Sequence, residues 1–239
     1  MSGVTTDTFF KGRLKVKQAR NGYRFSIDAV LLAHFVNPRP GDTILDLGSG
    51  CGIIPLMLAF RHPNVMLYGV EIQAALADLA LANVAVNGLA GRVTIMQQDL
   101  KDLTAGSMGG RIDLVVSNPP FRKVNSGRMN PHEQRAIARH EIMITLQDVI
   151  AAASRVLPLG GRFVTIYAVE RLVDMLVSLR AVKLEPKQMR MVHSNEDRKA
   201  HLFLMEAVKG GNPGLAVGPP LNIYNQAGGY TDEVAQMME

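Results

Sequence analysis

Residues 43–52 read TILDLGSGCG, a short apolar run followed by a turn in which glycine occupies every second position. Glycine lets the backbone take angles that other residues avoid, and it lets a ligand approach the chain closely. Thr43–Leu47 therefore predicts a buried strand, and a helix is expected through Gly52–Arg61. A strand, a glycine turn and a helix in this order indicate a ligand site at the carboxyl end of the strand.

The same alternation continues along the chain. After the first helix we expect a strand at Val65–Val70 and an alanine-rich helix at Ala74–Asn87, which Gly88 closes. Further strands are predicted at Val93–Gln97, Leu114–Val116, Arg162–Ala168, Gln188–Val192 and Leu202–Ala207, and further helices at Leu146–Leu157 and Arg171–Leu179. Alternating strands and helices predict an α/β, Rossmann-like fold, with a mostly parallel sheet and helices on both faces.

Two segments flank this alternation. Leu14–Ile27 alternates apolar and polar residues around Asn21-Gly22, which predicts an N-terminal β-hairpin turning there. Asp28 is expected to cap a helix at Ala29–Val36. We divide the chain into residues 1–40, the hairpin and helix of the same unit, residues 41–208, the α/β domain, and residues 209–239, a glycine- and proline-rich extension expected to pack loosely.

Composition indicates the kind of partner. The 239 residues include 26 Lys and Arg against 21 Asp and Glu, a net charge of +5, which fits a polyanionic partner. Thr8–Ile27 contains basic residues and no acidic one, and a second basic cluster follows Phe121. The two clusters supply the candidate phosphate contacts Lys15, Lys17, Arg20, Arg24, Arg122, Lys123 and Arg128.

The sequence also indicates the cellular compartment in which the protein works. Met1–Arg13 lacks the apolar core of a secretory signal, and the longest apolar run, Ile53–Phe60, is too short to span a bilayer. The single cysteine, Cys51, excludes an intramolecular disulfide framework. His34, His62 and His193 lack metal-ligand spacing, so no metal is expected. We therefore expect a cytoplasmic protein with no membrane contact.

Acidic residues end the next two predicted strands. Glu71 lies about twenty positions after Gly52, the spacing at which a carboxylate meets ribose hydroxyls. Asp99 ends the following strand, where its carboxylate can accept a hydrogen bond from an adenine amine. A dinucleotide is one ligand for such a site, but the glycines are spaced G-x-G-x-G and Asp46 stands just before them, two positions ahead of Gly48. A carboxylate there would repel a pyrophosphate and suit the amine and sulfonium of S-adenosylmethionine.

Ser117–Phe121, reading SNPPF, follows another apolar run. Each residue before a proline is held extended, and proline has no N–H to donate. The side-chain oxygen of Asn118 and the carbonyl of Pro119 can thus accept the two hydrogens of an exocyclic amine while Phe121 stacks on its ring. We predict these three residues as the catalytic group.

Together these features resemble the class I S-adenosylmethionine-dependent methyltransferases, and the Asn-Pro-Pro-Phe corner resembles their amino-methyltransferase branch. From about Val16 to Thr231 the chain is similar to the bacterial family that methylates the exocyclic amine, N6, of an adenosine in the anticodon loop of valine tRNA. The pieces that carry this similarity are residues 18–32, His193-Ser194, residues 206–211, Pro219–Leu221 and Tyr230-Thr231. The resemblance implies a seven-stranded sheet whose last strand is antiparallel.

The resemblance also implies roles for the site residues. S-adenosylmethionine is expected to bind Phe25, Asp28, Asp46, Gly48, Ser49, Gly50, Glu71, Ile72, Gln98, Asp99 and Asn118. The expected partner is tRNA. Methylation of a protein glutamine or of an rRNA base amine is the alternative activity, and a non-catalytic RNA-binding adaptor is the alternative from another class.

Overall fold

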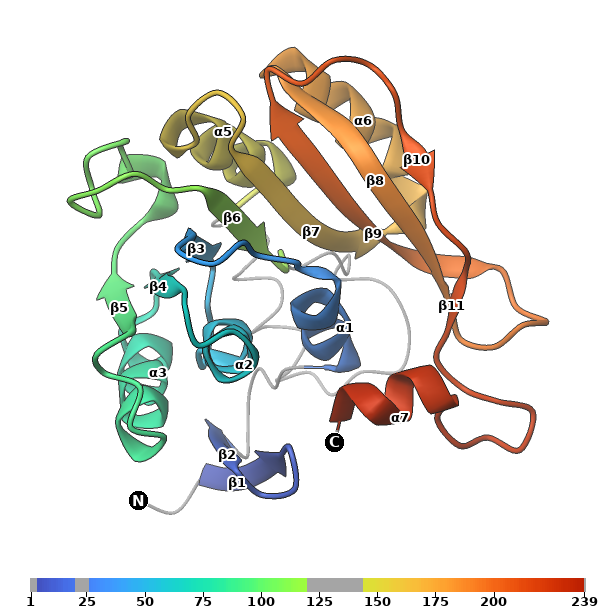
Figure 1. Cartoon of the computed structure of the whole chain (residues 1–239), viewed down its shortest axis with the longest axis horizontal. Helices are drawn as coiled ribbons and strands as arrows, with labels where there is room; N and C mark the ends of the chain where they lie inside the picture. The colour runs from blue at the N-terminus through green and yellow to red at the C-terminus, as the bar shows by residue number, and fades with distance from the viewer. Residues whose placement is uncertain (1–3, 20–25, 120–143, 239) are drawn as a thin grey trace.

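The computed structural model describes residues 4–19, 26–119 and 144–238 (Figure 1). Its centre is a mostly parallel sheet whose main strands run in the order β8-β9-β7-β6-β3-β4-β5. β9 pairs antiparallel with both neighbours, so the predicted fold class is confirmed. The strands are β3 (Thr43–Leu47), β4 (Met66–Glu71), β5 (Val93–Gln97), β6 (Leu114–Ser117), β7 (Arg162–Ala168), β8 (Leu184–His193) and β9 (Ala200–Lys209).

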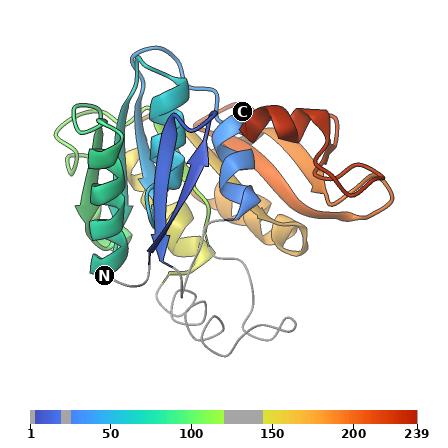
Figure 2. The same cartoon turned by 90° about the horizontal axis from the view of Figure 1, so that it is seen from below.

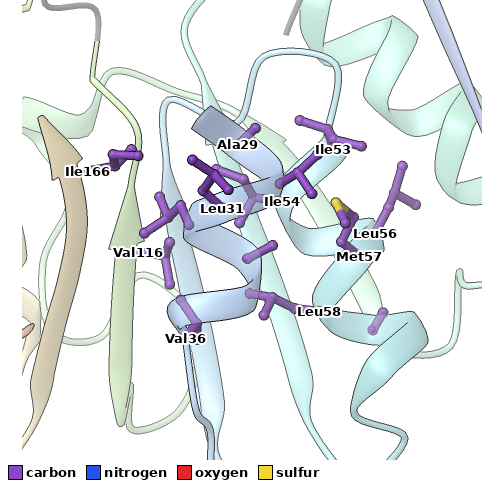
Figure 3. Close-up of a cluster of buried hydrophobic side chains, with 14 of the residues drawn as sticks. Ala29, Leu31, Val36, Ile53, Ile54, Leu56, Met57, Leu58, Val116 and Ile166 are labelled. Carbon is purple, nitrogen blue, oxygen red and sulfur yellow. The ribbon is translucent and has the colours of Figure 1, made fainter. Parts of the chain in front are cut away.

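Helices cover both faces of this sheet, as Figures 1 and 2 show. Successive strand residues point to opposite faces, and Ile44 and Leu45 accordingly belong to different buried clusters. α1 (Ile27–Phe35), α2 (Ile53–Arg61) and α3 (Ala74–Val86) cover one face, and α5 (Leu146–Val156) and α6 (Leu172–Ala181) cover the other. Figure 3 shows the first cluster, where side chains of α1 and α2 meet Val116 and Ile166 of the sheet.

The N-terminal hairpin is present, but its predicted position is wrong. β2 (Leu14–Ala19) pairs with β1 (Val4–Phe9), which precedes it, and Phe9 lies opposite Leu14. The turn uses positive φ angles at Phe10 (52°), Lys11 (57°) and Gly12 (83°). An alternating pattern does not say on which side a strand finds its partner, and Asn21-Gly22 lies outside the described residues.

The start of α1 also differs from the prediction. Ser26, not Asp28, occupies the N-cap position, and Asp28 lies in the first helical turn. Ser26 Oγ donates to Asp28 Oδ2 at 2.7 Å, and Asp28 is buried. Asp28 is thus held by the cap residue and is not itself the cap.

Two asparagines of α3 attach the hairpin to the main domain. The Asn83 side chain accepts from Lys17 N (2.8 Å) and donates to Lys17 O (2.9 Å). Asn87, one turn further on, makes the same pair of bonds with Lys15 at 2.9 and 2.7 Å. The two amides therefore replace a neighbouring strand along β2. Asn83 is fully buried and also donates to Cys51 O at 2.9 Å, which connects the hairpin to the glycine turn.

The C-terminal segment contains strands and a helix that the sequence did not predict. β10 (Ala216–Val217) and β11 (Leu221–Asn222) pair parallel with β8, so the described sheet has nine strands. α7 (Asp232–Met238) lies beside α1 and buries Val234 completely (Figures 1 and 2). Arg190 of β8 holds α7 through a two-pronged pair with Glu233 at 2.6 and 2.8 Å.

The described segments contain no helix long and apolar enough to cross a membrane.

Replacing Asn83 by alanine would leave the Lys17 N–H and two carbonyls without partners in a buried place. We expect the free energy of unfolding to fall by about 1–3 kcal/mol, the cost of unsatisfied buried polar groups. Urea unfolding measures this change. Leu81→Ala, an exposed change on the same helix, is the matched control and should cost less than about 0.5 kcal/mol. Equal effects of the two variants would contradict the proposed attachment.

Candidate active site

The glycine turn after β3 folds back over the end of β4. Gly48, Gly50 and Gly52 have φ angles of 77°, 55° and 83°, which side chains disfavour. The N–H groups of Gly48 and Ser49 both donate to Val70 O, at 2.9 and 3.0 Å. A Cβ on Gly52 would lie 3.2 Å from Ala80 Cβ, so this glycine also allows α3 to approach. The turn predicted from the sequence is confirmed.

Glu71 fastens this turn to the end of β4. Its Oε2 accepts from Gly50 N at 2.9 Å, and its Oε1 accepts from Gln73 N at 2.9 Å. The side chain is buried, with 3% of its surface exposed. A carboxylate offers about four acceptor positions, so ribose hydroxyls can still be accepted beside these amides. The predicted ribose contact at Glu71 remains a prediction.

Asp46 is the most unusual ionisable group of the site. It is 1% exposed, and neither carboxylate oxygen has a hydrogen-bond partner within the described part of the chain. Burial raises its pKa to about 7; the nearby Ser49 hydroxyl opposes this rise, and the charge of Glu71 adds to it. An orphaned buried carboxylate at a glycine turn suits a cationic ligand that restores its lost interactions. The chain's own residues therefore fit S-adenosylmethionine, whose sulfonium carries a positive charge.

Gly69, which the sequence analysis missed, makes room for the turn. A Cβ at this position would lie 2.5 Å from Ser49 Oγ, closer than any real contact allows. Ser49 Oγ in turn donates to Asp46 O at 3.2 Å. An isolated glycine inside a strand pattern signals such a close approach, so Gly69 was recognisable in principle.

The strand that carries Asn118 is fixed to the same turn. β6 lies next to β3, and the fully buried Ser117 donates from Oγ to Leu47 O at 2.8 Å. Asn118 is half-buried and Pro119 is buried at the carboxyl end of β6. The structure thus brings the described half of the SNPPF corner beside the glycine turn. Ser117 is a positioning residue that the sequence analysis did not assign.

The remaining predicted cofactor residues lie at the same edge. Gln98 N donates to Glu71 O at 3.1 Å, and Ile72 directly follows Glu71. Asp99 Oδ1 accepts from Lys101 N at 2.9 Å, so Asp99 caps the short helix Leu100–Asp102. Arg162 at the start of β7 donates to Asn37 O, just after α1, at 2.8 Å, so α1 ends at the edge where the strands begin. Its first turn, with Asp28, therefore lies toward the opposite edge, which carries the site.

Other predicted residues are further away or undescribed. The backbone N–H groups of Lys15 and Lys17 donate to the side chains of Asn87 and Asn83 on α3. Asn87 lies about 20 Å and Asn83 about 14 Å along the helix from its first residue. The predicted residues Arg20, Arg24, Phe25, Phe121, Arg122, Lys123 and Arg128 lie outside the described residues. Within the described ranges there is no group of three or more His, Cys, Asp or Glu that could hold a metal ion.

Solved structures share this fold. A predicted O-methyltransferase from Agrobacterium tumefaciens superposes with a TM-score of 0.70 at 19% identity, over 88% of this chain and 94% of that one. A SAM-dependent O-methyltransferase from Thermotoga maritima gives a TM-score of 0.55 at 20% identity, over 82% and 69%. Fold and site together define a class I, S-adenosylmethionine-dependent methyltransferase.

Sequence comparison identifies the family within this class of methyltransferases. The model of the Methyltransferase small domain family matches residues 26–176. A tRNA1(Val) (adenine(37)-N6)-methyltransferase from Porphyromonas gingivalis is 34% identical over 85% of this chain and 81% of the relative. The chain therefore belongs to the methyltransferase small domain family and, within it, to the tRNA1(Val) (adenine(37)-N6)-methyltransferases.

The raised pKa of Asp46 predicts opposite effects of pH on stability and on cofactor binding. A pKa raised from 3.8 to about 7 on folding gives stability that is present below pH 4 and lost as pH rises through 7. Asp46→Asn should therefore raise the thermal midpoint of the ligand-free protein, and raise it more at pH 8 than at pH 5.

Cofactor binding should change in the other direction, because only the ionised carboxylate attracts the cofactor's positive charge. We expect calorimetry to show that S-adenosylmethionine binds the wild type about 10-fold more tightly at pH 8 than at pH 6, beyond any change in Asp46→Asn. Asp46→Asn is the control, because any pH dependence that it shows arises from titration of the ligand and not of Asp46. Equal pH dependence in the two proteins would contradict the role of Asp46.

Proposed function

We propose that this protein transfers a methyl group from S-adenosylmethionine to N6 of an adenosine in the anticodon loop of tRNA. The name of the Porphyromonas gingivalis relative gives this reaction at adenine 37 of tRNA1(Val). The observation that carries the proposal is the placement of Asn118 and Pro119 at the end of β6, beside the glycine turn of β3.

This placement suits activation of a poor nucleophile. The exocyclic nitrogen of adenine reacts weakly because its lone pair is delocalised into the ring. If Asn118 Oδ1 and Pro119 O accept its two hydrogens, the nitrogen becomes more tetrahedral and its lone pair is localised. Phe121 would hold the ring by stacking, which contributes about 1–3 kcal/mol in single-strand binders.

S-adenosylmethionine supplies an electrophilic methyl group on its sulfonium when it is bound. Asp46 and the glycine turn would hold its methionine end, Glu71 the ribose and Asp99 the adenine amine. Phe25 and Asp28 would close over it. Holding two reactants in line can lower a barrier by about 7–11 kcal/mol, so no dedicated general base is required in the rate-determining step. S-adenosylhomocysteine would leave as the neutral thioether, and the methylated nitrogen would then lose a proton to solvent.

An anticodon-loop base suits such a site because it is already partly unstacked, which lowers the cost of extruding it. The predicted basic residues would bind the flanking phosphates. A tRNA substrate also implies that the protein works in the cytoplasm.

The direct test is nucleoside mass spectrometry of unmodified valine tRNA incubated with the protein and labelled S-adenosylmethionine. We expect labelled N6-methyladenosine, and none when the target adenosine is replaced by guanosine. Parallel incubations with rRNA and with a glutamine-bearing protein test the alternative substrates. Absence of methylated tRNA would contradict the proposal, and tRNA binding without methylation would indicate the adaptor function.

The clamp itself is tested by Asn118→Ala. We expect turnover to fall about 100-fold or more, as it does when one transition-state partner is lost, while affinity for S-adenosylmethionine changes far less because its other expected contacts remain. Asn64→Ala, at an exposed position before β4, is the matched control and should keep full activity. Wild-type turnover in Asn118→Ala would exclude the clamp.

The basic clusters are tested by the salt dependence of tRNA binding. Arg122 and Lys123 replaced together by alanine should flatten the slope of log affinity against log salt by about one to two units. Lys15 and Lys17 replaced together test whether the hairpin also contacts phosphates. If the slope stays at the wild-type value, the two replaced residues do not contact phosphates of the tRNA.

A further inference from the structure

Two tyrosines form a stacked, solvent-facing pair far along the chain from the cofactor residues. The rings of Tyr224 and Tyr230 have centroids 5.5 Å apart and planes within 13° of parallel. Each residue is 40% exposed. Nucleobases stack on exposed aromatic faces of this kind regardless of their sequence, so the pair is a candidate contact for an unpaired base.

The loop between the tyrosines is held rigid. Asn225 Oδ1 accepts from Ala227 N (3.0 Å) and Gly229 N (3.1 Å), and Asn225 Nδ2 donates to Tyr230 O (3.2 Å). The Asn225 backbone N–H donates to Gly229 O at 2.8 Å. A surface ordered before binding loses less conformational entropy when a ligand arrives, so this loop is pre-organised for contact.

Topology places the pair at the same edge of the sheet as Asn118. β7 and β8 are both antiparallel to β9, and β11 is parallel to β8, so β6, β7, β8 and β11 all point the same way. Tyr224 follows β11, and its N–H donates to Ser194 O at the end of β8 (2.8 Å). Figure 1 shows the turn after β8 and the loop after β11 on the same side of the molecule.

The separation suits one continuous RNA substrate. Four strand spacings separate β6 from β11, about 19 Å at roughly 4.8 Å per strand. The ladder sets Ser117 level with Met189 of β8, whereas Tyr224 is level with Ser194. The tyrosines therefore also lie about 15 Å further along the strands, which makes the separation from Asn118 roughly 24 Å. Stacked nucleotides advance about 3.4 Å each, so about seven of them cover this distance. A base at the tyrosines and an adenosine at Asn118 can therefore belong to the same RNA.

The charges around the pair indicate which part of a nucleotide meets the rings. The turn that joins β8 to β9 carries Arg198 and Lys199, both exposed, and His193 Nδ1 contacts Arg198 O at 2.7 Å. The same turn carries the carboxylates of Glu196 and Asp197, and Gln226 of the tyrosine loop donates to Glu196. The carboxylates of Glu196 and Asp197 disfavour a phosphate at the rings. Arg198 and Lys199 can instead bind phosphates of the RNA backbone further along the strand.

We propose that Tyr224 and Tyr230 form a stacking site for a second, unpaired nucleobase of the substrate tRNA, separate from the site of the methylated adenine. This inference rests on the proposed function, since it requires an RNA substrate. The site orients the RNA at the catalytic edge and makes no contact with the reacting atoms.

The test measures equilibrium binding of unmodified valine tRNA to the full chain. We expect Tyr224→Leu with Tyr230→Leu to weaken binding about 10-fold, and the matching pair of phenylalanine changes to keep it, because the rings remain. Val177→Ala, at an exposed apolar position on α6, is the control and should bind like the wild type. Affinity for S-adenosylmethionine should not change in any of these variants.

Tyr230→Leu alone provides a second variant if the double leucine change impairs folding, and it should weaken binding by a smaller factor. Wild-type tRNA affinity in the leucine variants overturns the stacking site even when methylation proceeds. A change of oligomeric state in size-exclusion chromatography also overturns it, since the rings would then hold a second copy of the chain. If the wild type neither binds nor methylates tRNA, the proposed function itself fails.

Discussion

The site depends on hydrogen bonds that tie three strand ends together. Glu71 at the end of β4 accepts from Gly50 N, and Ser117 at the end of β6 donates to Leu47 O at the end of β3. Both bonds are buried, where a lost partner costs the full desolvation of the group left behind. The turn, the carboxylates and Asn118 consequently keep fixed relative positions before any ligand arrives, and catalysis by positioning requires that fixity.

The same arrangement leaves a charged group in an unfavourable place. Asp46 is buried and has no hydrogen-bond partner among the described residues, and its neighbour Glu71 makes ionisation harder still. A protein selected only for stability would place an amide or an apolar residue there, because an unpaired buried charge is costly. A cationic ligand that binds beside Asp46 would explain this cost. The ligand would restore the interactions that the buried carboxylate lacks, and this gain would contribute to the affinity for the cofactor.

The flanking segments show why local patterns were insufficient. β8 starts at Leu184, before the predicted Gln188, because a register shift accommodates Pro186 within the strand. β2 pairs with β1, which precedes it in the chain, and not with the segment that follows it. The C-terminal extension, which was expected to pack loosely, contributes β10, β11 and α7. Each of these outcomes is decided by partners distant in the sequence, such as Asn83 and Asn87 for β2 or Arg190 for α7.

Local sequence patterns were enough to predict the order of strands and helices, the glycine turn, the acidic residues that follow the strands and the SNPPF corner. These follow from local chemistry, since side-chain periodicity and glycine or proline geometry act within a few residues. Three features became visible only in three dimensions: Asp46 has no partner among the described residues, Gly69 makes room for Ser49, and Ser117 connects β6 to β3. The tertiary structure also brought Tyr224 and Tyr230 to the edge that carries Asn118. These features arise where strands far apart in the chain become neighbours, and no local pattern encodes that proximity.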